Sequence, residues 1–170
     1  MELTEPLAKP TVAIMPFNLV LIAPEIPQNT GTIGRLCVCT ECRLHLVRPL
    51  GFQTDEASVR RAGLDYWQHL ELQIHDNWEA FLAAAQPGRL WFASTRGIAG
   101  LYDLRFAPDD FLVFGNESSG LPPVFHQRYA DRRFTIPMPG RHARSHNLAN
   151  AVSIVVYEAL RQTEFASCGT

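Results

Sequence analysis

Lysine is nearly absent from this chain of 170 residues: Lys9 is the only one, and every other cationic residue is arginine. Fifteen Lys and Arg residues are outnumbered by 17 Asp and Glu, so the formal net charge is -2. The chain therefore lacks the overall basic charge that is typical of nucleic-acid-binding proteins, and a nucleic-acid surface would have to come from local arginine clusters. Arginine suits such clusters because its planar guanidinium matches phosphates and base edges.

Long hydrophobic runs are also missing. No run approaches the length of a membrane span, and the first 15 residues lack the basic start and apolar stretch of a secretory signal. We therefore expect a soluble, cytoplasmic protein without a membrane segment. The composition, 46% hydrophobic and 19% charged, predicts one globular domain over residues 17–165, with an N-terminal extension over 1–16 and a C-terminal tail over 166–170.

Cysteine is scarce: there are four, and three of them fall between Cys37 and Cys42. A metal site would need a further Cys or His pair at a suitable spacing, and no such pair stands out. Cys37 falls on the apolar face of an expected helix. We therefore expect no metal and interpret these residues as buried, reduced thiols.

Apolar segments of strand type and of helix type alternate along the chain. The patterns predict strands over 18–23, 43–47, 70–75, 90–93, 111–114 and 134–136, and helices over 30–40, 55–62, 77–85, 122–129 and 147–162. Thr30 is the expected N-cap of the first helix. This alternation predicts an α/β fold with a mostly parallel sheet and helices on both faces.

Ligands of such sheets bind beyond the carboxyl ends of the strands, and three loops there carry unusual residues. In the first loop, Gly31 gives the backbone conformational freedom at the turn. The helix that follows can bind an anion through its first backbone amides, and Arg35 lies one turn into that helix. In the second, Gly115 permits close approach to the backbone. Glu117 in that loop either pairs with an arginine, orients a polar ligand group, or is a solvated acid.

The third loop, 136–147, combines cations with apolar side chains. Ser145 and Asn147 are good helix caps, and Arg141 and Arg144 lie close to a helix start that favours anions. Two further apolar residues of the loop, Ile136 and Met138, could enclose a flat ring. This mixture predicts a nucleotide-like ligand next to a partner that carries phosphate groups.

The three loops together resemble the motifs of the SPOUT methyltransferases, especially those that methylate the wobble nucleotide of tRNA. The matching stretches lie at 25–31, 35–37, 61–66, 114–122 and 144–159, so the resemblance extends from about residue 17 to residue 162. It implies 2′-O-methylation of C34 or U34 in tRNA, with S-adenosylmethionine as the methyl donor. It also implies a homodimer and a C-terminal deep trefoil knot, a rare exception to unknotted chains.

The resemblance also implies roles for individual residues. Catalysis or its support is implied for Asn29, Arg35, Glu117, Ser145 and Asn147. Contact with the cofactor is implied for Ala93, Ser94, Gly115, Ile136, Met138, Ser145 and Leu148. The resemblance ties Arg144 and Tyr157 to tRNA binding or to the integrity of the site. Arg141 belongs with Arg144 to a local cluster of arginines, and we expect it to contact RNA as well. Departures from the usual pattern at Gly34, Cys39, Glu41 and His146 bear on nucleotide preference more than on the chemistry.

The family is usually described with Arg35 as the group that activates the hydroxyl, but an arginine does not readily give up its proton. We therefore expect Arg35 to orient the hydroxyl and stabilise its developing negative charge. Two alternatives stay open: methylation of ribosomal RNA or of another tRNA position, and an RNA- or nucleotide-binding module without catalysis. A dehydrogenase is disfavoured because the first turn lacks G-x-G-x-x-G spacing.

Overall fold

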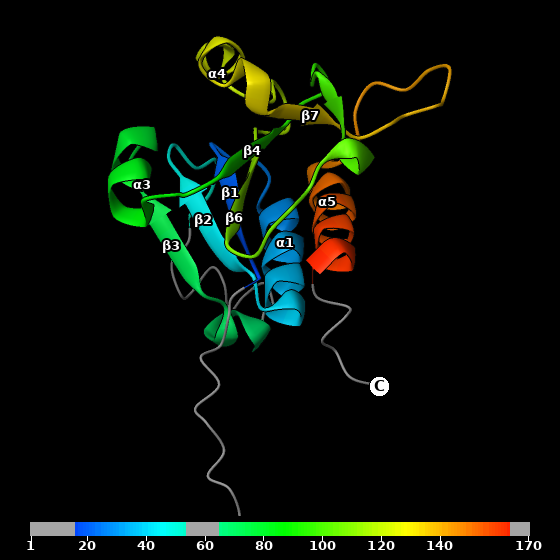
Figure 1. Cartoon of the computed structure of the whole chain (residues 1–170). Helices are drawn as coiled ribbons and strands as arrows, with labels where there is room; N and C mark the ends of the chain where they lie inside the picture. The colour runs from blue at the N-terminus through cyan, green and yellow to red at the C-terminus, as the bar shows by residue number, and fades with distance from the viewer. Residues whose placement is uncertain (1–15, 54–64, 164–170) are drawn as a thin grey trace, which may run out of the picture.

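The computed structural model describes residues 16–53 and 65–163, which form a seven-stranded parallel sheet with helices on both faces (Figure 1). The strands lie in the order β3-β2-β1-β6-β4-β7-β5, and every neighbouring pair is parallel. Their bounds are Phe17–Ile22 (β1), Arg43–Val47 (β2), Leu72–His75 (β3), Leu90–Ala93 (β4), Ala99–Gly100 (β5), Asp110–Phe114 (β6) and Arg133–Thr135 (β7). The predicted α/β fold with a mostly parallel sheet is confirmed.

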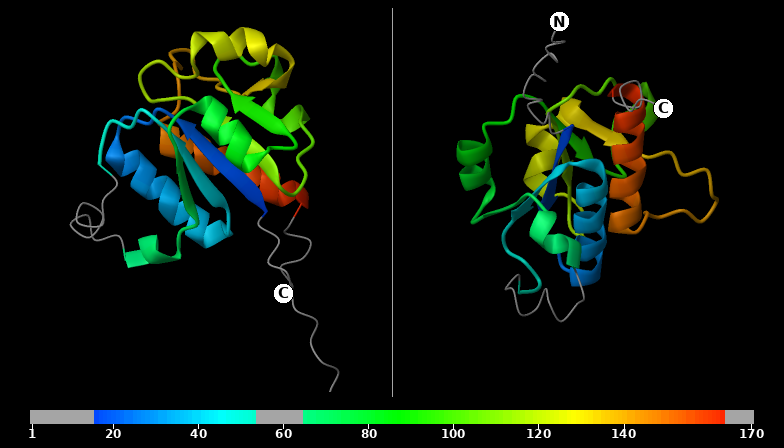
Figure 2. Two further views of the ribbon diagram at one scale, coloured as in Figure 1. Left: turned by 90° about the vertical axis from the view of Figure 1, so that its left-hand side faces the viewer. Right: turned by 90° about the horizontal axis from the view of Figure 1, so that it is seen from below.

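Two pairs of helices cover the two faces of the sheet, as the views of Figure 2 show. The α-helices are Pro27–Thr40 (α1), Trp78–Ala85 (α3), Pro123–Arg128 (α4) and Leu148–Thr163 (α5), with short 3-10 helices at Asp65–His69 (η1), Leu101–Asp103 (η2) and Ala130–Arg132 (η3). Helices α1 and α5 pack together over one apolar core, and α3 and α4 contribute to a second core on the opposite face.

Strand β1 lies inside the sheet and is apolar at every position except Asn18, because it is buried on both faces. Leu19 and Leu21 belong to the core under α1 and α5, whereas Val20 and Ile22 belong to the core under α3 and α4. A strand that is buried on both faces reads as a continuous hydrophobic run instead of an alternating one.

The start of α1 differs from the prediction. The helix begins at Pro27 with Ile26 as its N-cap, so the expected capping role of Thr30 is wrong. Proline is favoured at the first helical position because its missing N–H would be unpaired there in any case. Thr30 lies inside the helix, where its hydroxyl is buried without a hydrogen-bond partner among the described residues. The helix predicted over 55–62, with Arg60 and Arg61, lies outside the described residues.

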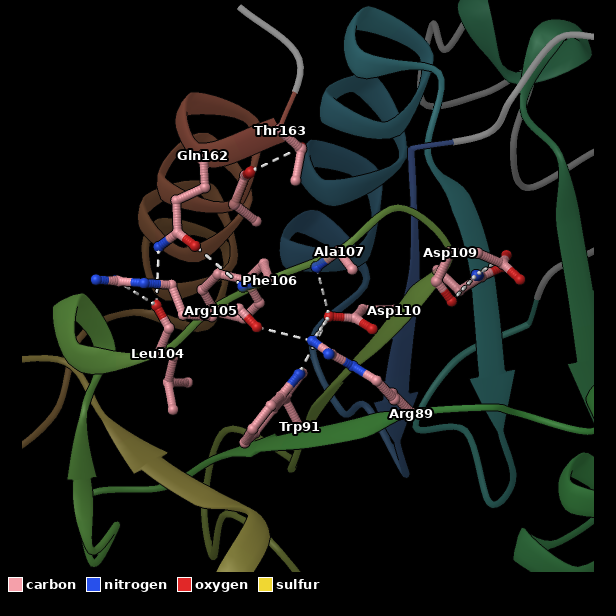
Figure 3. A network of polar contacts seen from close by, with 12 residues as sticks. Arg89, Trp91, Leu104, Arg105, Phe106, Ala107, Asp109, Asp110, Gln162 and Thr163 are labelled. Carbon is pink, nitrogen blue, oxygen red and sulfur yellow. Dashed lines mark hydrogen bonds and ion pairs between the residues drawn. The ribbon is translucent and has the colours of Figure 1, made fainter.

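The carboxyl end of α5 is tied to the loop that precedes β6 (Figure 3). The side chain of Gln162 accepts a hydrogen bond from the amide of Phe106 at 3.0 Å and donates to the carbonyl of Leu104 at 3.2 Å. Nearby, the buried carboxylate of Asp110 accepts hydrogen bonds from Arg89 at 2.7 Å and from the Trp91 indole at 3.2 Å. This polar network lies at the amino end of β6, so it fixes the fold at the edge opposite the predicted site.

Candidate functional site

The loops at the carboxyl ends of β1, β4, β6 and β7 surround a cavity of about 760 Å³. Most residues that sequence reasoning assigned to the site line it: Asn29, Ala93, Ser94, Gly115, Glu117, Ile136, Met138, Arg144, Ser145, Asn147 and Leu148. The cavity confirms that the three predicted loops converge at one edge of the sheet. Its volume falls in the range of pockets that hold nucleotide-sized ligands.

A chain of side-chain hydrogen bonds joins the three loops. The carboxylate of Glu117 accepts from the Asn29 side-chain amide at 3.0 Å, and the Asn29 carbonyl oxygen accepts from the Asn147 amide at 3.0 Å. The side-chain oxygen of Asn147 accepts hydrogen bonds from the backbone amides of Ala149 and Asn150, at 2.9 and 3.3 Å. Asn147 therefore caps α5, as expected from its residue type, and also links that helix to α1.

Of the roles left open for Glu117, a pair with an arginine is not seen among the described residues: its partners there are two backbone amides and Asn29. Its two carboxylate oxygens accept the backbone amides of Glu25, at 2.8 Å, and of Ile26, at 3.1 Å, in the turn that precedes α1. Burial by itself raises the pKa of Glu117, but the hydrogen bonds from Asn29 and from backbone amides outweigh it and lower the pKa. The acid is ionised and serves as an acceptor that holds the β1–α1 turn.

The loop that carries Glu117 depends on a tight backbone crossing. A Cβ atom on Gly115 would lie 2.0 Å from the carbonyl carbon of Gly120, so only glycine fits there. Asn116 closes the loop, because its side-chain oxygen accepts the amides of Ser119 and Gly120 at 2.7 and 3.1 Å. Sequence reasoning missed Asn116, although asparagine is a typical residue for such side-chain-to-backbone turns.

The loop that follows β4 forms one wall of the cavity and packs against β7. The amide of Ser94 donates to the carbonyl of Phe134 at 2.9 Å, and a Cβ on Gly97 would lie 2.1 Å from the Phe134 carbonyl carbon. Arg96 and His126 also line the cavity and were not singled out from the sequence. The available signal was the position of Arg96 in the turn after the strand predicted over 90–93.

The residues that do not line the cavity are Arg35, Arg141 and Tyr157. Arg141 is exposed on the loop before α5, and Tyr157 is 49% exposed on α5. Arg35 is exposed on α1, where its guanidinium carbon lies 4.9 Å from the centre of the Tyr66 ring. The structure thus places Arg35 outside the cavity of its own chain.

Residues 16–53 and 65–163 contain no group of three or more His, Cys, Asp or Glu residues that could hold a metal ion. No helix in this part of the chain is long and apolar enough to cross a membrane. Cys37 is buried as predicted, and burial raises its pKa well above the ordinary value. Burial also raises the pKa of Cys42, to about 11.

Comparison with known proteins agrees with this geometry. The family model described as SpoU rRNA Methylase matches residues 16–157. A tRNA (cytidine(34)-2′-O)-methyltransferase of Burkholderia ambifaria is 48% identical over 88% of this chain and 97% of its own. A solved structure described as giving insight into 2-OH methylation of C/U34 on tRNA is 48% identical, with a TM-score of 0.77 over 86% of this chain and 95% of that one.

An AdoMet-bound rRNA methyltransferase from Sinorhizobium meliloti is 26% identical, with a TM-score of 0.73 over 85% of this chain and 56% of that chain. The likeness therefore extends from close relatives of the same length to longer enzymes that share the same core. Together with the match of the family model over residues 16–157, it shows that the chain belongs to the SpoU methylase family.

Proposed function

We propose that the protein transfers a methyl group from S-adenosylmethionine (AdoMet) to the ribose 2′-hydroxyl of C34 or U34 in tRNA. The observation that carries this proposal is the hydrogen-bonded chain of Glu117, Asn29 and Asn147 at the rim of the cavity, because it unites the loops whose motifs resemble that enzyme group. The 48% identity to a tRNA (cytidine(34)-2′-O)-methyltransferase over nearly its whole length supports the same substrate.

The cavity suits an adenosine-containing cofactor. Ile136, Met138 and Leu148 give it an apolar side for a flat ring, and Gly115 leaves the backbone open to close approach. Ala93, Ser94 and Ser145 add backbone and hydroxyl groups. We propose that these residues hold S-adenosylmethionine, which supplies an electrophilic methyl group when it is bound.

The chain itself has to hold the ribose hydroxyl in line and stabilise the charge that develops on it. Alignment of the reacting atoms supplies a large part of the acceleration in such displacements. Asn29 and Asn147 are held in fixed orientations by their hydrogen bonds, so they form a rigid frame for the nucleotide. The guanidinium of Arg35 stabilises the developing negative charge on the oxygen.

A homodimer with a site completed across its interface belongs to the same proposal. Arg35 does not line the cavity of its own chain, which is consistent with a site to which a second copy contributes. Analytical ultracentrifugation at several protein concentrations tests the dimer, and a monomer at all of them would refute it.

We also propose the C-terminal trefoil knot that the resemblance implies and a cytoplasmic location. The same proposal gives Arg141, Arg144 and Tyr157 roles in tRNA binding.

Methylation is tested by incubating the purified protein with S-adenosylmethionine and unmodified tRNA, followed by mass spectrometry of the nucleosides. We expect a 2′-O-methylated pyrimidine that maps to position 34 and forms far more slowly, at a rate that is still measurable, in Arg35→Ala, while cofactor binding by calorimetry is retained. Near-normal turnover by Arg35→Lys would contradict the role given to Arg35. Methylation of ribosomal RNA in place of tRNA would replace the proposed substrate, and binding of RNA without methylation would leave a binding module.

A further inference from the structure

Tyr66, at the start of η1, contacts α1 in two ways. Its hydroxyl donates a hydrogen bond of 2.6 Å to the backbone carbonyl of Gly31, and its ring faces the guanidinium of Arg35 at 4.9 Å. In an α-helix the carbonyl of residue 31 is also the acceptor for the amide of residue 35. Tyr66 therefore contacts the same helical turn through both the backbone and the side chain of Arg35.

The neighbouring residues hold η1 close to α1. A Cβ on Gly34 would lie 3.1 Å from the ring of Trp67 and 3.2 Å from a methyl of Leu70, so the absence of a side chain at Gly34 allows this close packing. Gly34 is also one of the positions at which the chain departs from the usual family pattern. The place of Tyr66 relative to Arg35 is thus set by packing on both sides of the contact.

Within the described residues, the contact with Tyr66 leaves the charge of Arg35 unpaired by any carboxylate. None of the ion pairs within residues 16–53 and 65–163 involves Arg35, so no described carboxylate neutralises it. The face of an aromatic ring attracts a cation without removing its charge or occupying all of its N–H donors. A guanidinium held in this way is oriented in advance and keeps N–H donors that can bind an anionic or developing anionic oxygen.

We propose that Tyr66 is a positioning residue for methyl transfer, which acts by holding the guanidinium of Arg35 in the orientation that the ribose oxygen requires. This inference rests on the proposed function and deepens it, because it names a residue that serves the same site without lining the cavity. A misplacement of about 1 Å at a reacting group costs on the order of a hundredfold in rate. The loss of the ring should therefore lower the rate of transfer rather than the affinity for the cofactor.

The test is a double-mutant cycle on Tyr66 and Arg35, measured by single-turnover methylation of tRNA at saturating S-adenosylmethionine. We expect Tyr66→Leu to slow transfer by at least about tenfold, with cofactor affinity changed less than about twofold. Tyr66→Phe, which keeps the ring, should recover most of the rate. In the Arg35→Ala background, Tyr66→Leu should cause no further loss, because its effect passes through Arg35. Tyr102→Leu, on an exposed tyrosine of η2, is the matched control.

Two results would overturn the proposal and leave Tyr66 a structural residue. One is a fold-loss in rate in the double variant that equals the product of the two single losses. The other is a loss of cofactor affinity that parallels the loss of rate. A second measurement does not depend on methylation. The Nε–H resonance of Arg35, assigned by its disappearance in Arg35→Ala, should carry a ring-current shift that Tyr66→Leu removes and Tyr66→Phe retains. An unchanged resonance in Tyr66→Leu would refute the contact. Absence of methylation by the wild type would refute the proposed function, and the resonance would still decide the contact.

Discussion

Replacing Glu117 with glutamine keeps the shape of the side chain but replaces one of its two acceptor oxygens with an NH₂ group, which is a donor. The carboxylate now faces three donors: the amides of Glu25 and Ile26 and the side chain of Asn29. Glutamine must point its own amide nitrogen at one or two of them. If Asn29 rotates to compensate, its nitrogen meets the amide nitrogen of Asn147, which cannot turn without leaving the amides at the start of α5.

The expected cost follows from these contacts. Hydrogen bonds to charged groups contribute about 1.5–3 kcal/mol each, and Glu117 is only half-buried, so we expect a net loss of about 2 kcal/mol in the free energy of unfolding. For a chain of this size that corresponds to a fall in Tm of about 4–8 °C. The matched control is Glu79→Gln, whose exposed ion pair with Arg128 at 3.9 Å contributes less than about 1 kcal/mol.

Thermal unfolding measured against pH gives the sharpest form of this test. The pKa of Glu117 is lowered in the folded state, so its stabilisation is complete above the ordinary value of 4.5 and is lost as pH falls through the lowered pKa. The difference in Tm between wild type and Glu117→Gln should therefore shrink below pH 4.5. A variant that matched wild-type Tm at neutral pH, or a difference that did not change with pH, would refute the role given to the carboxylate.

Three other measurements probe separate parts of the molecule. Burial first, then the charges of His75 and Arg43, lower the pKa of His45 from 6.5 to about 3. The free energy of unfolding should therefore fall by about 2 kcal/mol between pH 6.5 and 4.5, because the unfolded state takes up a proton that folded His45 does not. Denaturation of His45→Phe should lack this component, and an unchanged dependence of stability on pH in that variant would contradict it. Gly115→Ala should lower the free energy of unfolding by about 3 kcal/mol, measured by denaturation, because its Cβ would clash with the backbone of Gly120. Gly88→Ala should be neutral, because nothing lies within 4 Å of a Cβ there. Equal effects of the two substitutions would count against the tight backbone crossing. Arg144→Ala should reduce the slope of log Kd for tRNA against log salt by about 1, and a flat salt dependence in the wild type would exclude phosphate contacts.

Most of the fold could be predicted from the sequence because its signals are local. The nearly continuous apolar run of β1 and the helical period of α5 each determine their own element. Strand β5 has only two residues, which is too short to give any period, and it was missed. The start of α1 was misplaced because Thr30 matched the N-cap pattern, while Pro27 and the acceptor on Glu117 decide where the helix begins.

The site was predictable as a set of residues but not as a set of contacts. Residue types and strand ends pointed to the loops of Asn29, Glu117 and Asn147, and the cavity contains all three. Which groups pair depends on side chains that are 88 and 118 residues apart, and no local pattern encodes that pairing. An arginine was one of the partners considered for Glu117, because charge complementarity is visible in a sequence, whereas unpaired backbone amides in a turn are not.

Helix α5 connects the site to the rest of the fold, because it is held at both ends by polar side chains. Asn147 fixes its start to α1, and Gln162 fixes its end to the loop before β6. Between these points its apolar face lies in the core beneath the sheet, so the helix cannot shift along its axis without breaking one set of hydrogen bonds. The cavity wall formed by the 136–147 loop thus has a rigid far end. Residues of this frame should affect stability and methylation together, whereas Arg35, exposed on α1, should affect methylation alone.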